Sequence, residues 1–265
     1  MKAGKVRKKV LALLLAGTAI LGLTGGGTMQ VEAAGQENAY VDTSSYEQLY
    51  KLYEDYFKLG IACQAMDHWN DPTAEIGNQE KEELINRMFN SMTFGNELKP
   101  AYNFDASSEN LFKVDFAAEE MLEWAKENNM KVRGHVLVWH SQVDPSIFAI
   151  DYQAYADGKL TKSDTAKLDE ECLVDREELL ARLKRYIYGV LEYTYKNGYA
   201  DVIYAWDVVN EAADENQYDG LRRSYWYQII GPDYLYYAFL YAREAETLYA
   251  NCLLYTSPSP RDGLL

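Results

Sequence analysis

The sequence predicts an α/β fold built on a parallel sheet, and three observations point to it. Apolar strand-like runs alternate with segments of helical spacing four times along the chain. No glycine-rich phosphate turn follows any of these runs, which argues against a doubly wound sheet. Polar residues gather where the strands end, as they do in eight-stranded barrels. We therefore expect part of a (β/α)8 barrel, about four β/α units long.

The individual elements follow from residue spacing. The sequence SYEQ at residues 45–48 has the form of a capping box, and the apolar residues after it predict a helix over residues 49–57. Strands are predicted at residues 59–65, 91–94, 131–139 and 202–210. Further helices are predicted at residues 84–89, 116–128, 176–196 and 234–249. A long polar connection, residues 141–174, separates the third strand from its helix, and connections of that length usually carry function or flex.

The N-terminal segment differs in character from the rest of the chain. Residues 1–33 begin with a group of basic residues, four lysines and one arginine, continue through an apolar run and end in small residues, which is the layout of a secretory signal peptide. A permanent membrane anchor is the alternative. We expect a secreted, extracellular protein that has no membrane contact after cleavage of the signal.

Composition narrows the possible functions. The chain has 265 residues, of which 48% are hydrophobic, enough for a buried core. Its net charge of −15 disfavours nucleic acid and anionic lipid as partners but does not disfavour a neutral polysaccharide. The three cysteines form no C-x-x-C pair, so neither a metal site nor a disulfide framework is indicated, and we expect no cofactor.

The third predicted strand ends in residues suited to sugar binding. Alternation along a strand would place His135, Leu137 and Trp139 on one face. A tryptophan beside polar donors suits a sugar ring, whose C–H face packs on an aromatic side chain. Taken alone, the same residues are more typical of a core histidine and a core tryptophan.

The fourth predicted strand ends in Asn210 and Glu211, an amide followed by a carboxylic acid. An acid at the end of a barrel strand is a candidate general acid/base. In a regular strand these two side chains would point apart, so the chain must bulge or turn there if both contact one substrate. The alternative is an ordinary loop acid, such as Asp214 or Glu215 nearby.

The second predicted strand leads into Asn96, Glu97 and Lys99, which offer further hydrogen-bonding side chains before Pro100. Singly, they would form an ordinary solvated loop.

The chain has no G-x-S-x-G elbow, no H-E-x-x-H and no phosphate loop. Hydrolysis by paired carboxylates is the chemistry that remains.

Together, the sequences GHVLVWHSQ at residues 134–142 and WDVVNE at residues 206–211 resemble the signature strands of glycoside hydrolase family 10. The sequences GNELKP at residues 95–100 and GPDY at residues 231–234 resemble its pattern too. On this resemblance, residues 40–251 are the N-terminal half of a catalytic barrel domain. The resemblance implies a retaining endo-1,4-β-xylanase, monomeric at full length, that acts on xylan or xylo-oligosaccharides.

The resemblance also assigns roles to residues. Glu211 matches the family's general acid/base, and Asn210 matches the amide that holds the 2-hydroxyl of the sugar at the cleavage site. The residues that match the glycone side of the cleft are Asn96, Lys99, His135, Trp139 and Gln142. One departure stands at Gly95, where many members carry a glutamate. The family takes its nucleophilic glutamate from the seventh strand, and no acid of this sequence matches that motif.

The C-terminal residues 252–265 change abruptly in character and resemble a translated sequencing adapter, with a Pro/Ser-rich linker as the alternative. We therefore expect a truncated sequence that lacks the nucleophile and is inactive as it stands. Two further alternatives remain open, a secreted xylan-binding protein without catalysis and a related barrel glycosidase that acts on another β-1,4-glycan.

Overall fold

The computed structural model describes residues 45–65, 72–152 and 170–249. All of them belong to one compact unit, Thr43–Leu265. The predicted signal peptide, residues 1–33, and the predicted adapter-derived tail, residues 252–265, lie outside the described residues, so both stay predictions. In the part of the chain that the structure describes, no helix is long and apolar enough to cross a membrane.

The centre of the unit is a four-stranded parallel sheet in which each strand pairs with the one before it in the chain, in the order β1-β2-β3-β4. Its strands are β1 (Gly60–Cys63), β2 (Ser91–Phe94), β3 (Lys131–Val138) and β4 (Ile203–Val209). Parallel pairing brings the carboxyl ends of all four strands to one edge of the sheet. This confirms the predicted α/β fold, with the sequential strand order of a partial barrel.

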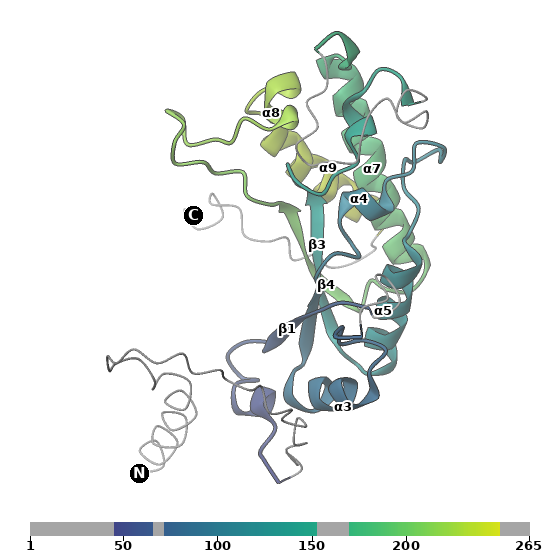
Figure 1. The fold of residues 1–265 in the computed structure, drawn as a ribbon, viewed down its shortest axis with the longest axis vertical. Helices are drawn as coiled ribbons and strands as arrows, with labels where there is room; N and C mark the ends of the chain where they lie inside the picture. The colour runs from purple at the N-terminus through teal and green to yellow at the C-terminus, as the bar shows by residue number, and fades with distance from the viewer. Residues whose placement is uncertain (1–44, 66–71, 153–169, 250–265) are drawn as a thin grey trace, which may run out of the picture. The chain divides into compact units, whose positions relative to one another are not determined.

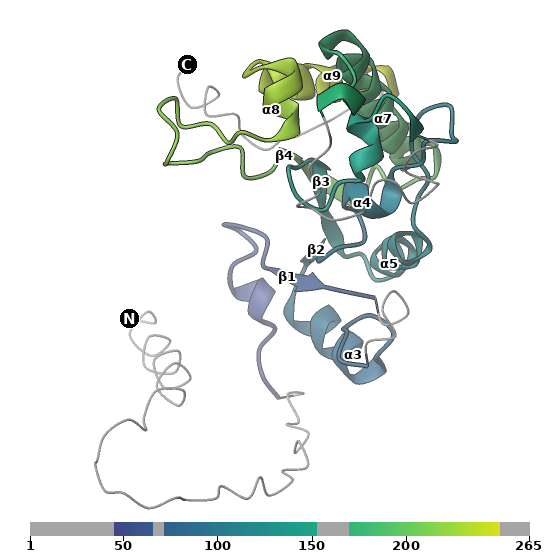
Figure 2. The same cartoon turned by 45° about the horizontal axis from the view of Figure 1, so that its top comes forward.

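Helices follow the strands as the alternating pattern predicted. The larger ones are α3 (Gln79–Met88), α5 (Phe116–Glu127), α7 (Arg176–Lys196) and α9 (Tyr234–Tyr249). Short helices in the connections are η1 (Leu49–Leu52), α4 (Pro100–Asn103), η2 (Pro145–Phe148), η3 (Glu170–Cys172) and α8 (Tyr225–Ile230). Helices α5 and α7 lie along the same side of the sheet (Figures 1 and 2).

Side-chain caps fix where the helices begin. The Asp115 carboxylate accepts a hydrogen bond from Ala117 N and starts α5, and the Asp175 carboxylate accepts one from Glu178 N and starts α7. Such caps satisfy backbone donors that have no partner inside the helix. The first residue of α7 is therefore set by the sequence, as predicted.

Two predictions about the helices were wrong. The predicted helix over residues 49–57 is only the short η1, and Gln48, not Ser45, precedes it without a side-chain cap. No residue of η1 is buried. A helix this short needs tertiary burial to persist, so its apolar spacing was not enough. The second error is α8, because no helix was predicted between the strand at residues 202–210 and the helix at residues 234–249.

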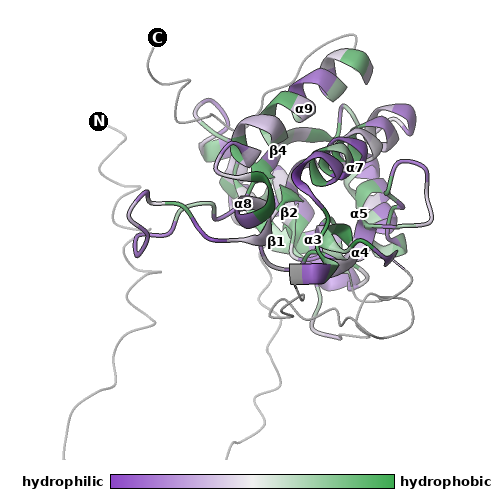
Figure 3. Cartoon of the chain, turned by 90° about the horizontal axis from the view of Figure 1, so that it is seen from above, coloured by the Kyte–Doolittle hydropathy of each residue, from purple (hydrophilic) through white to green (hydrophobic). Residues whose placement is uncertain are grey.

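The hydrophobic core lies between the strands and the helices. Hydrophobic residues gather on the central strands, and hydrophilic ones dominate the loop between β4 and α8 (Figure 3). Fully buried side chains come from both layers, as with Met92 and Phe94 of β2, Met121 of α5 and Leu179 of α7. This packing holds the carboxyl ends of the strands in fixed positions, where the predicted site residues lie.

Candidate active site

The backbone changes conformation where β4 ends. Asn210 N still donates to Val138 O at 2.9 Å, which continues the pairing with β3 for one residue. Glu211 then adopts a φ of 49°, in the left-handed region that residues other than glycine rarely occupy. Such strained positions concentrate at functional sites. The chain therefore leaves regular strand geometry at Glu211, as it must if Asn210 and Glu211 are to contact one substrate.

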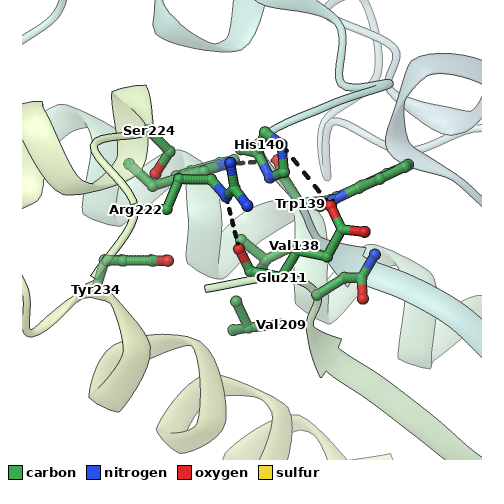
Figure 4. Close-up of a pocket in the computed structure, with 10 residues that line it drawn as sticks. Val138, Trp139, His140, Val209, Glu211, Arg222, Ser224 and Tyr234 are labelled. Carbon is green, nitrogen blue, oxygen red and sulfur yellow. Dashed lines mark hydrogen bonds and ion pairs between the residues drawn. The ribbon is translucent and has the colours of Figure 1, made fainter. Parts of the chain in front are cut away.

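The Glu211 carboxylate faces two ring nitrogens from the end of β3. Trp139 Nε1 donates to Glu211 Oε2 at 3.0 Å, and His140 Nε2 lies 3.8 Å from the same oxygen. Figure 4 shows both rings directed at the carboxylate. The hydrogen bond from Trp139 holds the Glu211 carboxylate in place. The Glu211 side chain is still 53% exposed, so it remains open to a ligand.

Helix α8 and the loop before it hold the backbone of Glu211 and Trp139 by hydrogen bonds. Arg222 Nε donates to the backbone oxygen of Glu211 at 2.9 Å, and Trp226 Nε1 donates to the backbone oxygen of Trp139 at 3.0 Å. A small pocket between these segments is lined by Val138, Trp139, His140, Val209, Asn210, Glu211, Arg222, Ser224, Trp226 and Tyr234 (Figure 4). Asn210 therefore lines the same pocket as Glu211.

A second group of site residues lies at the end of β2, and we call Asn96, Lys99 and Gln142 the Lys99 cluster. Lys99 Nζ donates to Asn96 Oδ1 at 2.9 Å and also to Gln142 Oε1. Gln142 Nε2 donates to the same Asn96 oxygen at 3.1 Å. Lys99 Nζ also lies 5.1 Å from the centre of the Trp139 ring. The cluster is therefore joined to Glu211 through Trp139.

The fully buried carboxylate of Glu97 holds this end of the site. Its Oε1 accepts a hydrogen bond from Ala65 N at 3.0 Å, and its Oε2 accepts one from Asn96 N at 2.9 Å. One carboxylate thus ties the residue after β1 to the residue that begins the Lys99 cluster. Charge-assisted hydrogen bonds of this kind are among the stronger ones in proteins.

His135 is oriented by Asp207 and Arg133, neither of which was among the predicted site residues. His135 Nδ1 lies 2.8 Å from Asp207 Oδ2, and Arg133 Nε donates to Asp207 Oδ1 at 2.9 Å. Burial alone would raise the pKa of Asp207, but the hydrogen bonds from His135 and Arg133 outweigh it and keep that pKa below its usual value. An ionised carboxylate can only accept, so Nδ1 carries the hydrogen and Nε2 faces away from Asp207.

The predicted alternation of side chains between the two faces of the sheet does not continue to the end of β3. The His135 and Trp139 rings do lie together, with their centres 6.1 Å apart. Leu137, however, is buried in the core instead of sharing their face. The pairing of β3 with β4 shifts register between His135 and Val138, and that irregularity breaks the period of two.

The predicted site residues therefore form one connected arrangement. Contacts run from the Lys99 cluster through Trp139 to Glu211, with His135 beside Trp139 and Asn210 beside Glu211. Asp207 was missed because its position opposite His135 depends on the register between β3 and β4, which the sequence of neither strand shows. Within the described ranges, no group of three or more His, Cys, Asp or Glu side chains could hold a metal ion.

Comparison with known proteins identifies the family. The glycosyl hydrolase family 10 profile matches residues 48–257. Endo-1,4-beta-xylanase A of Thermotoga maritima is 38% identical over 199 residues, and the endo-1,4-beta-xylanase A of Caldicellulosiruptor sp. is 40% identical over 198 residues. Each match covers 75% of this chain, but only 16% and 25% of the respective relative.

Solved structures agree with the sequence matches. An intracellular xylanase from Thermoanaerobacterium saccharolyticum superposes with a TM-score of 0.59 at 33% identity, over 77% of this chain and 54% of that one. A mutant of that enzyme in complex with xylotetraose superposes equally well, at 34% identity. The chain spans about half the length of these structures and a quarter or less of the curated relatives above. The family match covers most of the sequence, and this chain belongs to glycosyl hydrolase family 10.

Proposed function

We propose that the full-length protein is a retaining endo-1,4-β-xylanase in which Glu211 is the general acid/base. The observation that carries the proposal is the position of the Glu211 carboxylate. It stands half-exposed at a strand end, hydrogen-bonded to Trp139, and contacts link it to a cluster of hydrogen-bonding side chains. The named activity of the relatives supplies the substrate class.

Each part of the arrangement has a role in this proposal. The face of Trp139 packs against a sugar ring, and the Lys99 cluster provides hydrogen bonds for the hydroxyls of the glycone side. Asn210, beside Glu211, holds the 2-hydroxyl of the sugar at the cleaved bond. Glu211 first protonates the departing glycosidic oxygen and then, as a base, removes a proton from the incoming water.

Retention of configuration also needs a nucleophilic carboxylate, roughly 5 to 5.5 Å from the acid/base. We assign none of the acids in this sequence to that role, and we propose that a further part of the full-length protein supplies it. The limited share of its relatives that the chain spans supports this proposal. Sequencing the gene beyond Ala250 tests it, since a gene that encodes no further barrel strand ending in glutamate would contradict the double-displacement mechanism.

The role of Glu211 is tested by Glu211→Ala in the full-length protein. Hydrolysis of xylan should fall by a factor on the order of 10³ or more, because the leaving oxygen loses its proton donor. An aryl xyloside with a good leaving group should still form the glycosyl-enzyme, because its departure needs no protonation. Glu215→Ala, which changes an exposed acid of the following loop, is the matched control.

Two outcomes would overturn this assignment. Undiminished xylan hydrolysis by Glu211→Ala would remove Glu211 from the mechanism. A wild-type full-length protein that binds xylan without hydrolysing it would support the alternative of a non-catalytic binding protein. Comparison of hydrolysis rates on xylan and on cellulose distinguishes a xylanase from a related glycosidase of another β-1,4-glycan.

We also propose that the protein is secreted and is monomeric at full length. The arrangement of basic, apolar and small residues in the first 33 positions supports secretion. The question needs its own experiment, because one structurally similar xylanase is described as intracellular. Mature protein recovered from the medium with an N-terminus near residue 34 is the expected result, and sedimentation analysis gives its oligomeric state.

A further inference from the structure

An unusual contact between Gln64 and Gly95 lies next to the Lys99 cluster. Gln64 follows β1, Gly95 follows β2, and Gly95 N donates to Cys63 O at 2.7 Å. A Cβ atom added at Gly95 would lie 2.8 Å from Cγ of Gln64 and 3.2 Å from its Nε2. Real Cβ atoms do not approach other atoms this closely, so the Gln64 side chain occupies the space that any side chain at position 95 would need.

The Gln64 side chain points to the face of the sheet that carries the site. Strands β1 and β2 pair in register up to Cys63 and Phe94, so the next pair is Gln64 with Gly95. Across β2 and β3, Thr93 pairs with Arg133. Because residues two apart in a strand share a face, Gly95 lies in the same row as His135. Gln64 therefore extends this row to β1.

The backbone of Gln64 is fixed, whereas its carboxamide is available. Gln64 N donates to Glu75 Oε2 at 3.1 Å, Gln64 O accepts from Ile76 N at 3.0 Å, and the next residue, Ala65, is bound by Glu97. The side chain is partly exposed, and its amide makes no hydrogen bond with any residue in the part of the chain that the structure describes. The fixed backbone and the packing of the Gln64 side chain over Gly95 reduce the conformational freedom that is lost when the amide binds a ligand.

We propose that Gln64 is a sugar-binding residue that contacts a unit of the β-1,4-xylan chain remote from the cleaved bond. Gln64 and Glu211 are separated by three strand spacings, roughly 14 Å across the sheet, so they do not contact the same sugar ring. A carboxamide both donates and accepts hydrogen bonds, which suits neighbouring hydroxyls of a neutral sugar. This inference rests on the proposed function and extends it to a further binding position.

The test measures xylotetraose affinity by calorimetry in a full-length Glu211→Gln background, which prevents hydrolysis. Gln64→Ala should weaken binding roughly threefold to tenfold, the loss expected for one neutral hydrogen bond. Gln79→Ala, which truncates an exposed glutamine of α3, is the matched control and should leave the affinity unchanged. If the Glu211→Gln parent protein and its Gln64→Ala variant bind xylotetraose with equal affinity, the inference about Gln64 is overturned and the proposed function is kept. A parent that does not bind xylotetraose overturns the proposed function and the inference with it.

A double-mutant cycle provides a second test that does not depend on truncating Gln64. In the parent, Gly95→Ala should weaken xylotetraose binding about as much as Gln64→Ala, because the new methyl group displaces the Gln64 side chain. In the Gln64→Ala background, the same Gly95→Ala change should have little further effect, because there is no side chain left to displace. Additive losses across the cycle would overturn the inference, since they would show that residue 95 acts independently of Gln64.

Discussion

The two ends of the candidate site are built in opposite ways. At the end of β2, Lys99 is only 7% exposed, and three side chains are linked by mutual hydrogen bonds above the buried Glu97. At the end of β4, the Glu211 side chain is 53% exposed, makes a single short contact with Trp139 and extends from a strained backbone. The first end is rigid and filled, and the second is open.

This difference suits the β2 end to substrate binding and the β4 end to proton transfer. A residue that holds a sugar gains from a fixed position, because less conformational entropy is lost when the ligand binds. A residue that exchanges protons with a leaving group and with water must remain accessible to both. Changes at the β2 end should therefore act mainly on stability and binding, whereas changes at the β4 end should act mainly on turnover.

The largest stability effect is expected from Glu97→Ala at the β2 end. The substitution leaves the buried backbone N–H of Ala65 and the partly buried N–H of Asn96 without their acceptor, which should lower the free energy of unfolding by about 3 kcal/mol. Thermal denaturation of the full-length protein measures the loss. Glu83→Ala, in the exposed part of α3, is the control. Equal melting temperatures for the two variants would contradict the description of a rigid β2 end.

The next largest effect is expected from Lys99→Met, which keeps most of the side-chain volume but removes the charge. The hydrogen bonds to Asn96 and Gln142 disappear, so xylotetraose affinity should fall roughly tenfold to a hundredfold. Calorimetry in the Glu211→Gln background measures the affinity, with the exposed Lys113→Met as control. If Lys99→Met reduced turnover with no loss of affinity, the assignment of binding to the β2 end would be wrong.

A smaller, pH-dependent effect is expected from Asp207→Asn between the two ends. The pKa of Asp207 is lowered in the folded state, so its stabilisation is fully present above the ordinary carboxyl pKa of about 3.9 and is lost as the pH falls through the folded-state value. The variant should be less stable by about 1 kcal/mol near neutral pH, since Arg133 is half-exposed and contributes weakly.

Urea unfolding at several pH values measures this difference. The gap between wild type and Asp207→Asn should close as the pH falls below about 4, because protonation removes the same charge from the wild type. Asp201→Asn, at an exposed turn before β4, should show no such convergence. A gap that widens in acid would mean that Asp207 does not stabilise the fold through its ionised form.

The smallest effect is expected from Ser224→Ala, which removes the cap of α8. Ser224 Oγ accepts a hydrogen bond from Tyr227 N at 3.3 Å, and the loss of such a cap lowers the free energy of unfolding by about 1 kcal/mol or less. Because α8 supports Trp139 through Trp226, turnover should fall slightly while xylotetraose affinity is kept. Ser107→Ala in an exposed loop is the control, and a larger loss of affinity than of turnover would contradict the separation of the two ends.

Much of the fold follows from the sequence because its signals are local. The bounds of β2 and α7 agree with the predicted residues 91–94 and 176–196, since apolar periodicity and the Asp175 cap coincide there. The helix predicted over residues 49–57 failed because amphipathic spacing does not reveal whether a partner surface exists. Helix α8 was missed because six residues are too few for a clear period.

The site was predictable where residues stand at strand ends and less so where they meet across strands. Strand-end positions made Glu211 and Trp139 candidates, the family resemblance assigned their roles, and the structure brings them into contact. The partnership of Asp207 with His135 depends on the register between β3 and β4, and the contact of Gln64 with Gly95 depends on that between β1 and β2. No local pattern in a single strand encodes a register of this kind.

The sequential order of the strands has a consequence for how the protein is made. Each strand pairs with the one synthesised just before it, so the sheet can grow by one strand at a time as the chain leaves the ribosome. Gln64 and Gly95 can meet once β2 has formed, and the Lys99 cluster closes when Gln142 arrives after β3. Trp139 gains its partner Glu211 last. The sequential strand order thus allows the contacts of the β2 end to form before those of the β4 end.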